Sequence, residues 1–225
     1  MSDWACIFDL DGVLADTEPF WDRSAIELLS RRGKMRDLAL TVRCRGRQPI
    51  EVARMYVEHY QLDESPEAIR DERLAIIETL YRGGLPAMPG ALELVAALAA
   101  QRVPLAVASG SPTRLVKVVL EAIDLKDAFV DAIGSDQVTN GKPSPELFLL
   151  AAERIGIQAE RCVVIEDSIA GVTAALAAQM SCVHLAIDGV APLPEADLVV
   201  ATLERLFPQT LLALIERRAA CCPKS

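Results

Sequence analysis

The stretch IFDLDGVLADTEP, residues 7–19, begins as an apolar run and then turns acidic. Asp9 and Asp11 stand two residues apart, so at the end of a β-strand their side chains point the same way. Gly12 follows directly and permits a tight turn. Because two like charges at the rim of a buried strand repel each other, the pattern predicts a strand end with a chemical role, where a further group offsets the repulsion.

Beyond this stretch, short apolar runs rich in Val, Ile and Ala alternate with segments of helical period. We predict strands at residues 5–9, 104–109, 162–167 and 182–186, with weaker candidates at 131–135 and 197–200. Helices fit between them at about 112–123, 144–155, 169–179 and 208–219. The alternation indicates an α/β fold: a doubly wound, Rossmann-like parallel sheet that binds ligands at the carboxyl ends of its strands.

One long segment interrupts the alternation. Residues 17–85 contain helical patterns such as FWDRSAIELLSRR and PEAIRDERLAIIETLY but no convincing strand. The Gly- and Pro-containing stretch RGGLPAMPG at residues 82–90 is typical of a return hinge. We therefore predict a core domain made of residues 1–15 and 86–225, with an α-helical cap domain of residues 16–85 inserted into it.

Composition limits the class of protein. The chain has 225 residues, of which 52% are hydrophobic, and a net charge of -9. An acidic chain without a basic run is not expected to bind nucleic acid. The sequence shows no signal-peptide pattern and no apolar stretch of membrane-spanning length, so we expect a cytoplasmic monomer. Its six cysteines include no C-x-x-C pair, which favours reduced thiols, three of them in predicted strands.

Polar side chains follow three other predicted strands. Ser109 ends PLAVAS, Glu166 and Asp167 end CVVIED, and Lys142 lies beyond the weak strand at 131–135. Each of these residues alone could be a helix cap or a turn residue. Their convergence on one rim, together with Asp9, is hard to attribute to capping and favours a functional site.

The candidate ligands at this rim are all oxygen atoms, which predicts a hard divalent cation. Mg²⁺ is the natural choice, because it offsets the repulsion between carboxylates and prefers oxygen donors. An EF-hand is excluded, since its loop glycine belongs at position six and Gly12 stands at position four. Ser109, the backbone N–H groups of Gly110 and Ser111, and Lys142 would form an anion cradle nearby. Carboxylates, Mg²⁺ and an anion cradle together indicate phosphoryl transfer.

The chain resembles a known family, the haloacid dehalogenase superfamily of phosphohydrolases. The resemblance rests on DLDGV at 9–13, VASGSP at 107–112, GKPSPE at 141–146 and VIEDSIAG at 164–171, in the family's order. It points to the branch with a helical cap after the first strand, which includes β-phosphoglucomutase and small sugar-phosphate phosphatases. The implied function is Mg²⁺-dependent hydrolysis of a small phosphorylated metabolite.

The resemblance also implies roles for the motif residues. Asp9 would be the nucleophile that forms an aspartyl-phosphate, and Asp11 would be the general acid and base. Asp9, the backbone carbonyl of Asp11 and Asp167 would hold Mg²⁺, with Glu166 as a ligand or as a partner of one. Ser109, Gly110 and Lys142 would bind the phosphate. Dehalogenases of the superfamily lack an acid at the position of Asp11, which argues against carbon–halogen hydrolysis.

The cap is expected to select the substrate. RCRGRQPIE brings Arg43, Arg45 and Arg47 together, and either Arg45 or Arg47 could bind a distal group of the substrate; a solvated helix end is the alternative. Trp21 stands where the mutase has a histidine, which favours water as the phosphoryl acceptor. Trp21 could pack in the cap core or wall off solvent from the site, and both readings stay open.

Alternative functions remain. One is a phosphoryl transferase like β-phosphoglucomutase, and another is a non-catalytic, regulatory member that keeps the pocket. An intact set of motif residues disfavours the second. Lys34, as the only lysine of the predicted cap, has a solvated setting unlike that of a Schiff-base lysine. His59 and His184 are interpreted as packing or surface residues.

Overall fold

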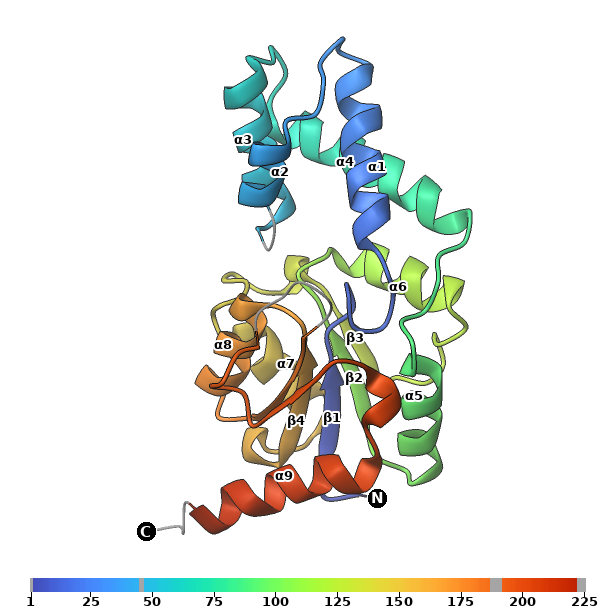
Figure 1. Cartoon of the computed structure of the whole chain (residues 1–225), viewed down its shortest axis with the longest axis vertical. Helices are drawn as coiled ribbons and strands as arrows, with labels where there is room; N and C mark the ends of the chain where they lie inside the picture. The colour runs from blue at the N-terminus through green and yellow to red at the C-terminus, as the bar shows by residue number, and fades with distance from the viewer. Residues whose placement is uncertain (1, 45–46, 187–191, 222–225) are drawn as a thin grey trace.

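The computed structural model describes residues 2–44, 47–186 and 192–221. Within these ranges the centre of the molecule is a parallel sheet in the order β3-β2-β1-β4-β5-β6 (Figure 1). The strands are β1 (Ala5–Phe8), β2 (Leu105–Ala108), β3 (Asp131–Ile133), β4 (Cys162–Glu166), β5 (Ser181–Leu185) and β6 (Leu198–Val200). The predicted parallel α/β fold is confirmed, and β1 lies at its centre between β2 and β4.

Alternate residues of β1 enter the hydrophobic cores on the two faces of the sheet. Cys6 and Phe8 pack with side chains of α5 (Ala91–Ala100), α6 (Thr113–Ala122) and α9 (Pro208–Cys221). Ala5 and Ile7 pack on the opposite face with α7 (Glu146–Ile155) and α8 (Ile169–Ala177). Because helices cover both faces, β1 and β2 are apolar at every position, as is typical of parallel sheets.

Two differences from the sequence-based prediction concern α5 and the start of α7. The prediction omits α5, because its sequence ALELVAALAA is apolar around most of the helix and has little periodicity. The helix predicted at 144–155 begins two residues later, at Glu146, since residues 141–144 form a turn closed by the Ser144 N–H and the Gly141 carbonyl. Short 3₁₀ helices, η1 (Ser135–Gln137), η2 (Ala159–Arg161) and η3 (Leu203–Arg205), also lie in connecting segments.

Between β1 and α5 the described residues form α1 (Glu18–Ser30), α2 (Leu38–Cys44), α3 (Pro49–Tyr60) and α4 (Pro66–Arg82). We call these helices the helical insert. They have a hydrophobic cluster of their own, which includes Leu28, Tyr56 and Ile69. The helical insert stands over the carboxyl ends of the strands (Figure 1). The division into a core domain and a cap domain at residues 15/16 and 85/86 stays a prediction.

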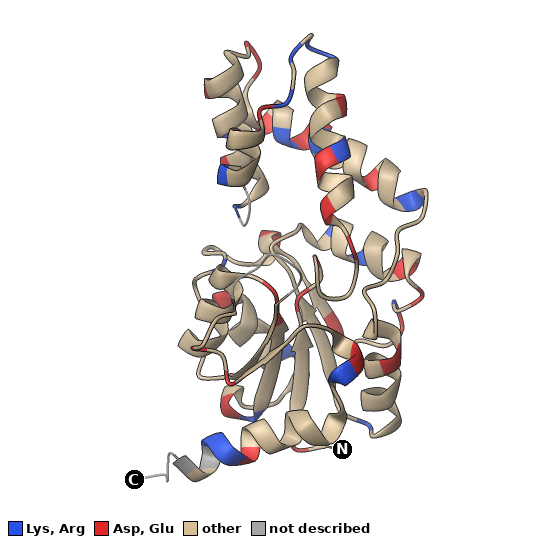
Figure 2. Cartoon of the chain, in the orientation of Figure 1, with Lys and Arg blue, Asp and Glu red and all other residues tan. Residues whose placement is uncertain are grey.

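Charged side chains connect two helices of the insert. Glu72 of α4 accepts hydrogen bonds from Arg31, at 2.8 Å, and from Arg32, at 2.5 Å, both next to the end of α1. Figure 2 shows acidic and basic residues interspersed along these helices. Contacts of this kind at a surface contribute little stability individually, so the apolar cluster beneath them holds the insert together.

The thiols agree with the prediction of buried, reduced cysteines. Cys6, Cys162 and Cys182 are free and buried in β1, β4 and β5, while Cys44 is free and half-buried. Cys222 lies outside the described residues. None of the helices in the described ranges combines the length and the apolar character that a membrane span requires.

Candidate active site

The first strand ends in a tight turn that brings two carboxylates to the rim of the sheet. Asp9 follows β1 and donates its backbone N–H to the Ile165 carbonyl of β4 at 3.0 Å. Gly12 has a φ of +79°, and a Cβ added there would lie 2.4 Å from Oδ2 of Asp167. The glycine is therefore needed twice, for the turn and for the close approach of Asp167.

Lys142 lies at the centre of the acidic cluster. Its Nζ donates to Oδ1 of Asp9 at 2.5 Å and to Oε1 of Glu166 at 2.5 Å. The ammonium also lies 4.8 Å from the centroid of the Phe148 ring on α7. The segment predicted to cradle an anion thus reaches the predicted nucleophile directly, because the turn at 141–144 places Lys142 at the same rim as β1 and β4.

The carboxylate of Glu166 is held at both oxygens. Oε1 accepts from Lys142, and Oε2 accepts from the backbone N–H of Ser168 at 2.8 Å and from its hydroxyl at 2.9 Å. A Cβ on Gly171 would lie 1.8 Å from Oε1, so only glycine fits at this place in the first turn of α8. Glu166 therefore orients Lys142, while Ser168 holds the Glu166 carboxylate and Gly171 leaves room for it.

Burial and mutual charge shift the pKa values of the ionisable side chains in this cluster. Burial raises the pKa of Asp9 to about 8, against the opposing charge of Lys142. The pKa of Asp167 also lies well above its usual value because of burial, to which the charges of Glu166 and Asp9 add. Although burial alone lowers the pKa of Lys142, the carboxylates of Asp9 and Glu166 raise it well above its usual value. One ammonium therefore does not fully offset the charge of the carboxylates around it.

Asp11 has a different environment, in which neutral donors surround both oxygens. Oδ2 accepts from the hydroxyls of Ser109 at 3.0 Å and Ser111 at 2.9 Å, which follow β2. Oδ1 accepts from the hydroxyl of Thr17 at 2.7 Å and from the indole Nε1–H of Trp21 at 3.3 Å. Asp11 thus joins the rim of the sheet to the start of the helical insert.

The segment after β2 leaves space beside these hydroxyls. The Ser111 N–H donates to Oγ of Ser109 at 3.0 Å, while a Cβ on Gly110 would meet no atom within 4 Å. This open space borders the buried hydroxyl of Ser109 and the start of α6. The arrangement suits a small anion with several oxygens, which the hydroxyls and backbone N–H groups of this segment could bind.

The site residues predicted in the cap are not gathered in one place. Arg45 lies outside the described residues. Arg47 is exposed, and its Nε donates to the Arg43 carbonyl at 2.9 Å, at the end of α2. Of the site residues predicted in the cap, Trp21 reaches Asp11 with its side chain.

The two histidines have packing and surface roles, as the sequence predicts. His59 contacts Oδ2 of Asp37 at 3.1 Å and packs edge-on against Tyr60. His184 is buried in β5, where its ring nitrogens contact the Asp167 carbonyl and the Leu193 N–H.

Some residues of the site are not predicted as such from the sequence. The hydroxyl of Ser111, of which only the backbone N–H is predicted to take part, contacts Asp11, and the hydroxyl of Ser168 contacts Glu166. Gly171 makes room for the Glu166 carboxylate. Their positions next to the motifs, in SGSP and EDSIAG, are the signal that could have identified them. Arg73 on α4 gives no such local signal, because its contact with Trp21 joins residues far apart in the chain.

The donor set fits a hard divalent cation. Among the described residues, no three His, Cys, Asp or Glu side chains are grouped closely enough to hold a metal by themselves. The two carboxylates of Asp9 and Asp167 would therefore need a backbone carbonyl to complete a protein ligand set. Glu166 has both oxygens engaged by Lys142 and Ser168, so it is better placed to support Lys142 than to bind the metal.

Comparisons with known proteins agree with this arrangement. A family model described as haloacid dehalogenase-like hydrolase matches residues 5–179. The chain is 31% identical to the fructose-1-phosphate phosphatase YqaB of Escherichia coli (strain K12), over 80% of this chain and 94% of that protein. It is 36% identical to a probable pseudouridine-5'-phosphatase of Drosophila melanogaster, over 79% of each chain.

A solved structure has the same fold. The β-phosphoglucomutase of Clostridium difficile superposes with a TM-score of 0.84 at 23% identity, covering 96% of this chain and 98% of that one. At this level of identity the likeness concerns the fold alone. The family model and the phosphatase relatives confirm both the resemblance and the predicted class of enzyme. The chain belongs to the haloacid dehalogenase-like hydrolases, and within them it is an enzyme of the phosphatase type.

Proposed function

We propose that the protein is a Mg²⁺-dependent phosphatase that hydrolyses a small phosphomonoester, such as a sugar phosphate, through an aspartyl-phosphate on Asp9. The observation that carries the proposal is the contrast between two neighbouring carboxylates. Asp9 contacts a buried ammonium, whereas Asp11 accepts hydrogen bonds from neutral groups. Relatives named for fructose 1-phosphate and for a pseudouridine phosphate support a sugar-containing substrate.

In the first step, a carboxylate oxygen of Asp9 attacks the phosphorus atom and the bond between phosphorus and the leaving oxygen breaks. Asp11 donates its proton to that leaving oxygen, so the product departs as a neutral alcohol. Lys142 already lies 2.5 Å from Asp9 and would offset negative charge that builds on the phosphoryl oxygens. The hydroxyl of Ser109 would turn from Asp11 toward the phosphate.

In the second step, a water molecule attacks the phosphorus of the aspartyl-phosphate. Asp11, now ionised, takes a proton from that water, the bond between phosphorus and Asp9 breaks, and inorganic phosphate leaves. Asp11 is protonated again at the end of the cycle.

Mg²⁺ bound by Asp9, Asp167 and the Asp11 carbonyl would supply positive charge to the transferring phosphoryl group and to the carboxylates. The buried carboxylates have one ammonium among them, which is the feature that supports a cation here. Glu166 would keep Lys142 directed at Asp9. Water is the proposed acceptor because Trp21, whose indole cannot accept a proton, occupies the position next to Asp11.

The experiment is release of inorganic phosphate from a panel of sugar phosphates, with Mg²⁺ and with EDTA. We expect release with Mg²⁺ and its loss with EDTA. Asp9→Asn should reduce release by at least a hundredfold while the circular dichroism spectrum is retained. Asp124→Asn is the matched control, because Asp124 is exposed and its φ of 58° also suits asparagine. The proposal fails if folded wild-type protein releases phosphate from no member of the panel, or if Asp9→Asn keeps more than about a hundredth of the activity.

A further inference from the structure

The indole of Trp21 contacts the residue proposed as general acid and base. Its Nε1–H donates to Oδ1 of Asp11 at 3.3 Å, beside the 2.7 Å hydrogen bond from Thr17. We propose that Trp21 is a positioning residue for Asp11, and that Arg73 holds Trp21 in the orientation that this contact requires. The inference rests on the proposed function, because it concerns how Asp11 is prepared for proton transfer.

An indole differs from a hydroxyl in a way that matters for the proton. Nε1–H can only donate, whereas the hydroxyls of Ser109 and Ser111 can rotate and accept. When Asp11 is protonated, the donor-only indole keeps Oδ1 as its acceptor, which favours the proton on Oδ2, where two hydroxyls can turn to accept it. Trp21 thereby selects the oxygen that exchanges a proton with the leaving group, and this oxygen lies beside Ser109 and the open space at Gly110.

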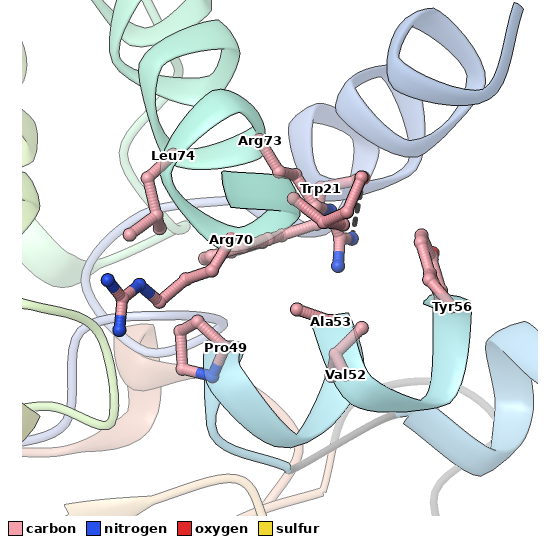
Figure 3. Close-up of a pocket in the computed structure, with 9 residues that line it drawn as sticks. Trp21, Pro49, Val52, Ala53, Tyr56, Arg70, Arg73 and Leu74 are labelled. Atoms are coloured by element: carbon pink, nitrogen blue, oxygen red, sulfur yellow. Dashed lines mark hydrogen bonds between the residues drawn. The ribbon is translucent and has the colours of Figure 1, made fainter. Parts of the chain in front are cut away.

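Arg73 contacts Trp21 and restricts its orientation. Its guanidinium lies 5.1 Å from the centroid of the Trp21 ring and 5.3 Å from that of Tyr56. Nη2 donates to the Trp21 carbonyl at 3.2 Å, and Nε donates to the Ser24 hydroxyl at 3.1 Å. Figure 3 shows Arg73 beside Trp21, with Tyr56 across from it on α3. The arginine therefore contacts both the ring and the backbone of Trp21.

The contacts of Arg73 are unusual for a largely buried cation. The rings of Trp21 and Tyr56, a hydroxyl and a carbonyl are all uncharged groups. Burial accordingly lowers the pKa of the Arg73 guanidinium from its usual value. A cation that is buried against aromatic rings costs stability unless the geometry offsets it, so its presence behind Trp21 suggests a positioning role.

The space around the pair is small. The two residues line a cavity between α1, α3 and α4, together with Pro49, Ala53 and Leu74 (Figure 3). It has room for about one water molecule. Trp21 thus has little freedom to turn away from Asp11 while α3 and α4 stay packed.

The kinetic experiment compares two kinds of leaving group. An alkyl phosphate such as fructose 1-phosphate needs a proton from Asp11 as its alkoxide departs, whereas p-nitrophenyl phosphate has a leaving group that is stable without one. Trp21→Phe keeps the aromatic ring and removes the N–H. We expect it to lower kcat/KM about tenfold for the alkyl phosphate and less than about twofold for p-nitrophenyl phosphate, since a positioned acid contributes 10² to 10⁴ in all.

Two further variants sharpen this comparison. Arg73→Lys keeps the charge but loses the planar stacking, and it should shift the ratio of the two kcat/KM values in the same direction. In the double variant with both Trp21→Phe and Arg73→Lys, the ratio of the two kcat/KM values should equal that of Trp21→Phe alone, because Arg73 acts through Trp21. Trp4→Phe is the matched control, as it removes the chain's other indole, which is buried before β1, at the opposite end of that strand from Asp9; it should leave the ratio unchanged.

A second readout does not depend on activity. The chain has two tryptophans, so a ¹⁵N–¹H spectrum contains two indole signals, and the Trp4 and Trp21 variants assign them. Asp11→Ala and Arg73→Lys should each move the Trp21 signal and leave the Trp4 signal in place. A Trp21 signal that is unaffected by Asp11→Ala would overturn the contact.

The outcomes separate the two proposals. If wild-type protein hydrolyses neither substrate, the proposed function fails, and the indole spectrum alone decides whether Trp21 bonds Asp11. If wild-type protein is active and Trp21→Phe lowers both kcat/KM values equally, or neither, Trp21 is a structural residue and the inference is wrong.

Discussion

The substitution Gly171→Ala tests how the site is built. Its effect on helix propensity should stabilise the fold, whereas its contact with Glu166 should destabilise it. Gly171 lies in the first turn of α8, where alanine is the better helix former by about 1 kcal/mol. In the folded protein, however, the added Cβ would lie 1.8 Å from Oε1 and 1.9 Å from Cδ of Glu166. The carboxylate would have to move.

The cost of that movement follows from its contacts. Glu166 is 1% exposed and bonds Lys142 and both donors of Ser168. Breaking a buried ion pair by displacing one partner costs about 3–5 kcal/mol. Alanine's better helix propensity offsets about 1 kcal/mol of this cost, so we expect Gly171→Ala to lower the free energy of unfolding by about 2–4 kcal/mol. Phosphate release should also fall, because Lys142 is no longer held against Asp9.

Urea denaturation followed by circular dichroism measures the first effect, and the phosphate-release assay measures the second. Ala170→Gly in the same turn calibrates the helix term and should cost about 1 kcal/mol or less. If Gly171→Ala leaves the urea midpoint unchanged or raises it, then Glu166 can move without loss. In that case the reasoning that Gly171 exists to admit the carboxylate is wrong.

Two further predictions concern buried groups. Lys142→Gln should reduce phosphate release at least about a hundredfold and lower the urea midpoint, because Asp9 and Glu166 would lose their shared cation; near-normal release would contradict the role of this ammonium. Burial raises the pKa of the Cys162 thiol to about 12, and Cys6 is likewise buried. Neither thiol should react with 5,5′-dithiobis(2-nitrobenzoic acid) in the native protein, whereas both should react in urea; rapid native labelling, located by peptide mapping, would contradict their burial.

Much of the fold can be predicted from local sequence. Each predicted strand is present within one or two residues, because a parallel sheet covered on both faces leaves apolar, β-branched runs that are easy to recognise. The omission of α5 has the same origin, since a helix that is apolar around most of its surface loses its period. The connection between α4 and α5 lies where the glycines and prolines of residues 82–90 predict a break between helices.

The candidate site can be predicted in part. Asp9, Ser109, Lys142 and Asp167 follow strand ends, and parallel topology brings such ends to one rim, so their proximity follows from order along the chain. The separate environments of Asp9 and Asp11 do not follow from the order of residues along the chain. They depend on which donors reach each carboxylate, and among these Ser111 and Lys142 come from segments 100 and 133 residues away.

The sequence by itself determined the parallel α/β fold, the inserted helices and the set of groups at the strand ends, because periodicity and strand order are properties of the chain. Only the tertiary structure decided that Lys142 joins Asp9 to Glu166, and that Trp21 turns to Asp11 with Arg73 behind it. The physical reason is that hydrogen bonds and ring contacts act over about 3–6 Å, and no local pattern specifies which distant side chains come that close.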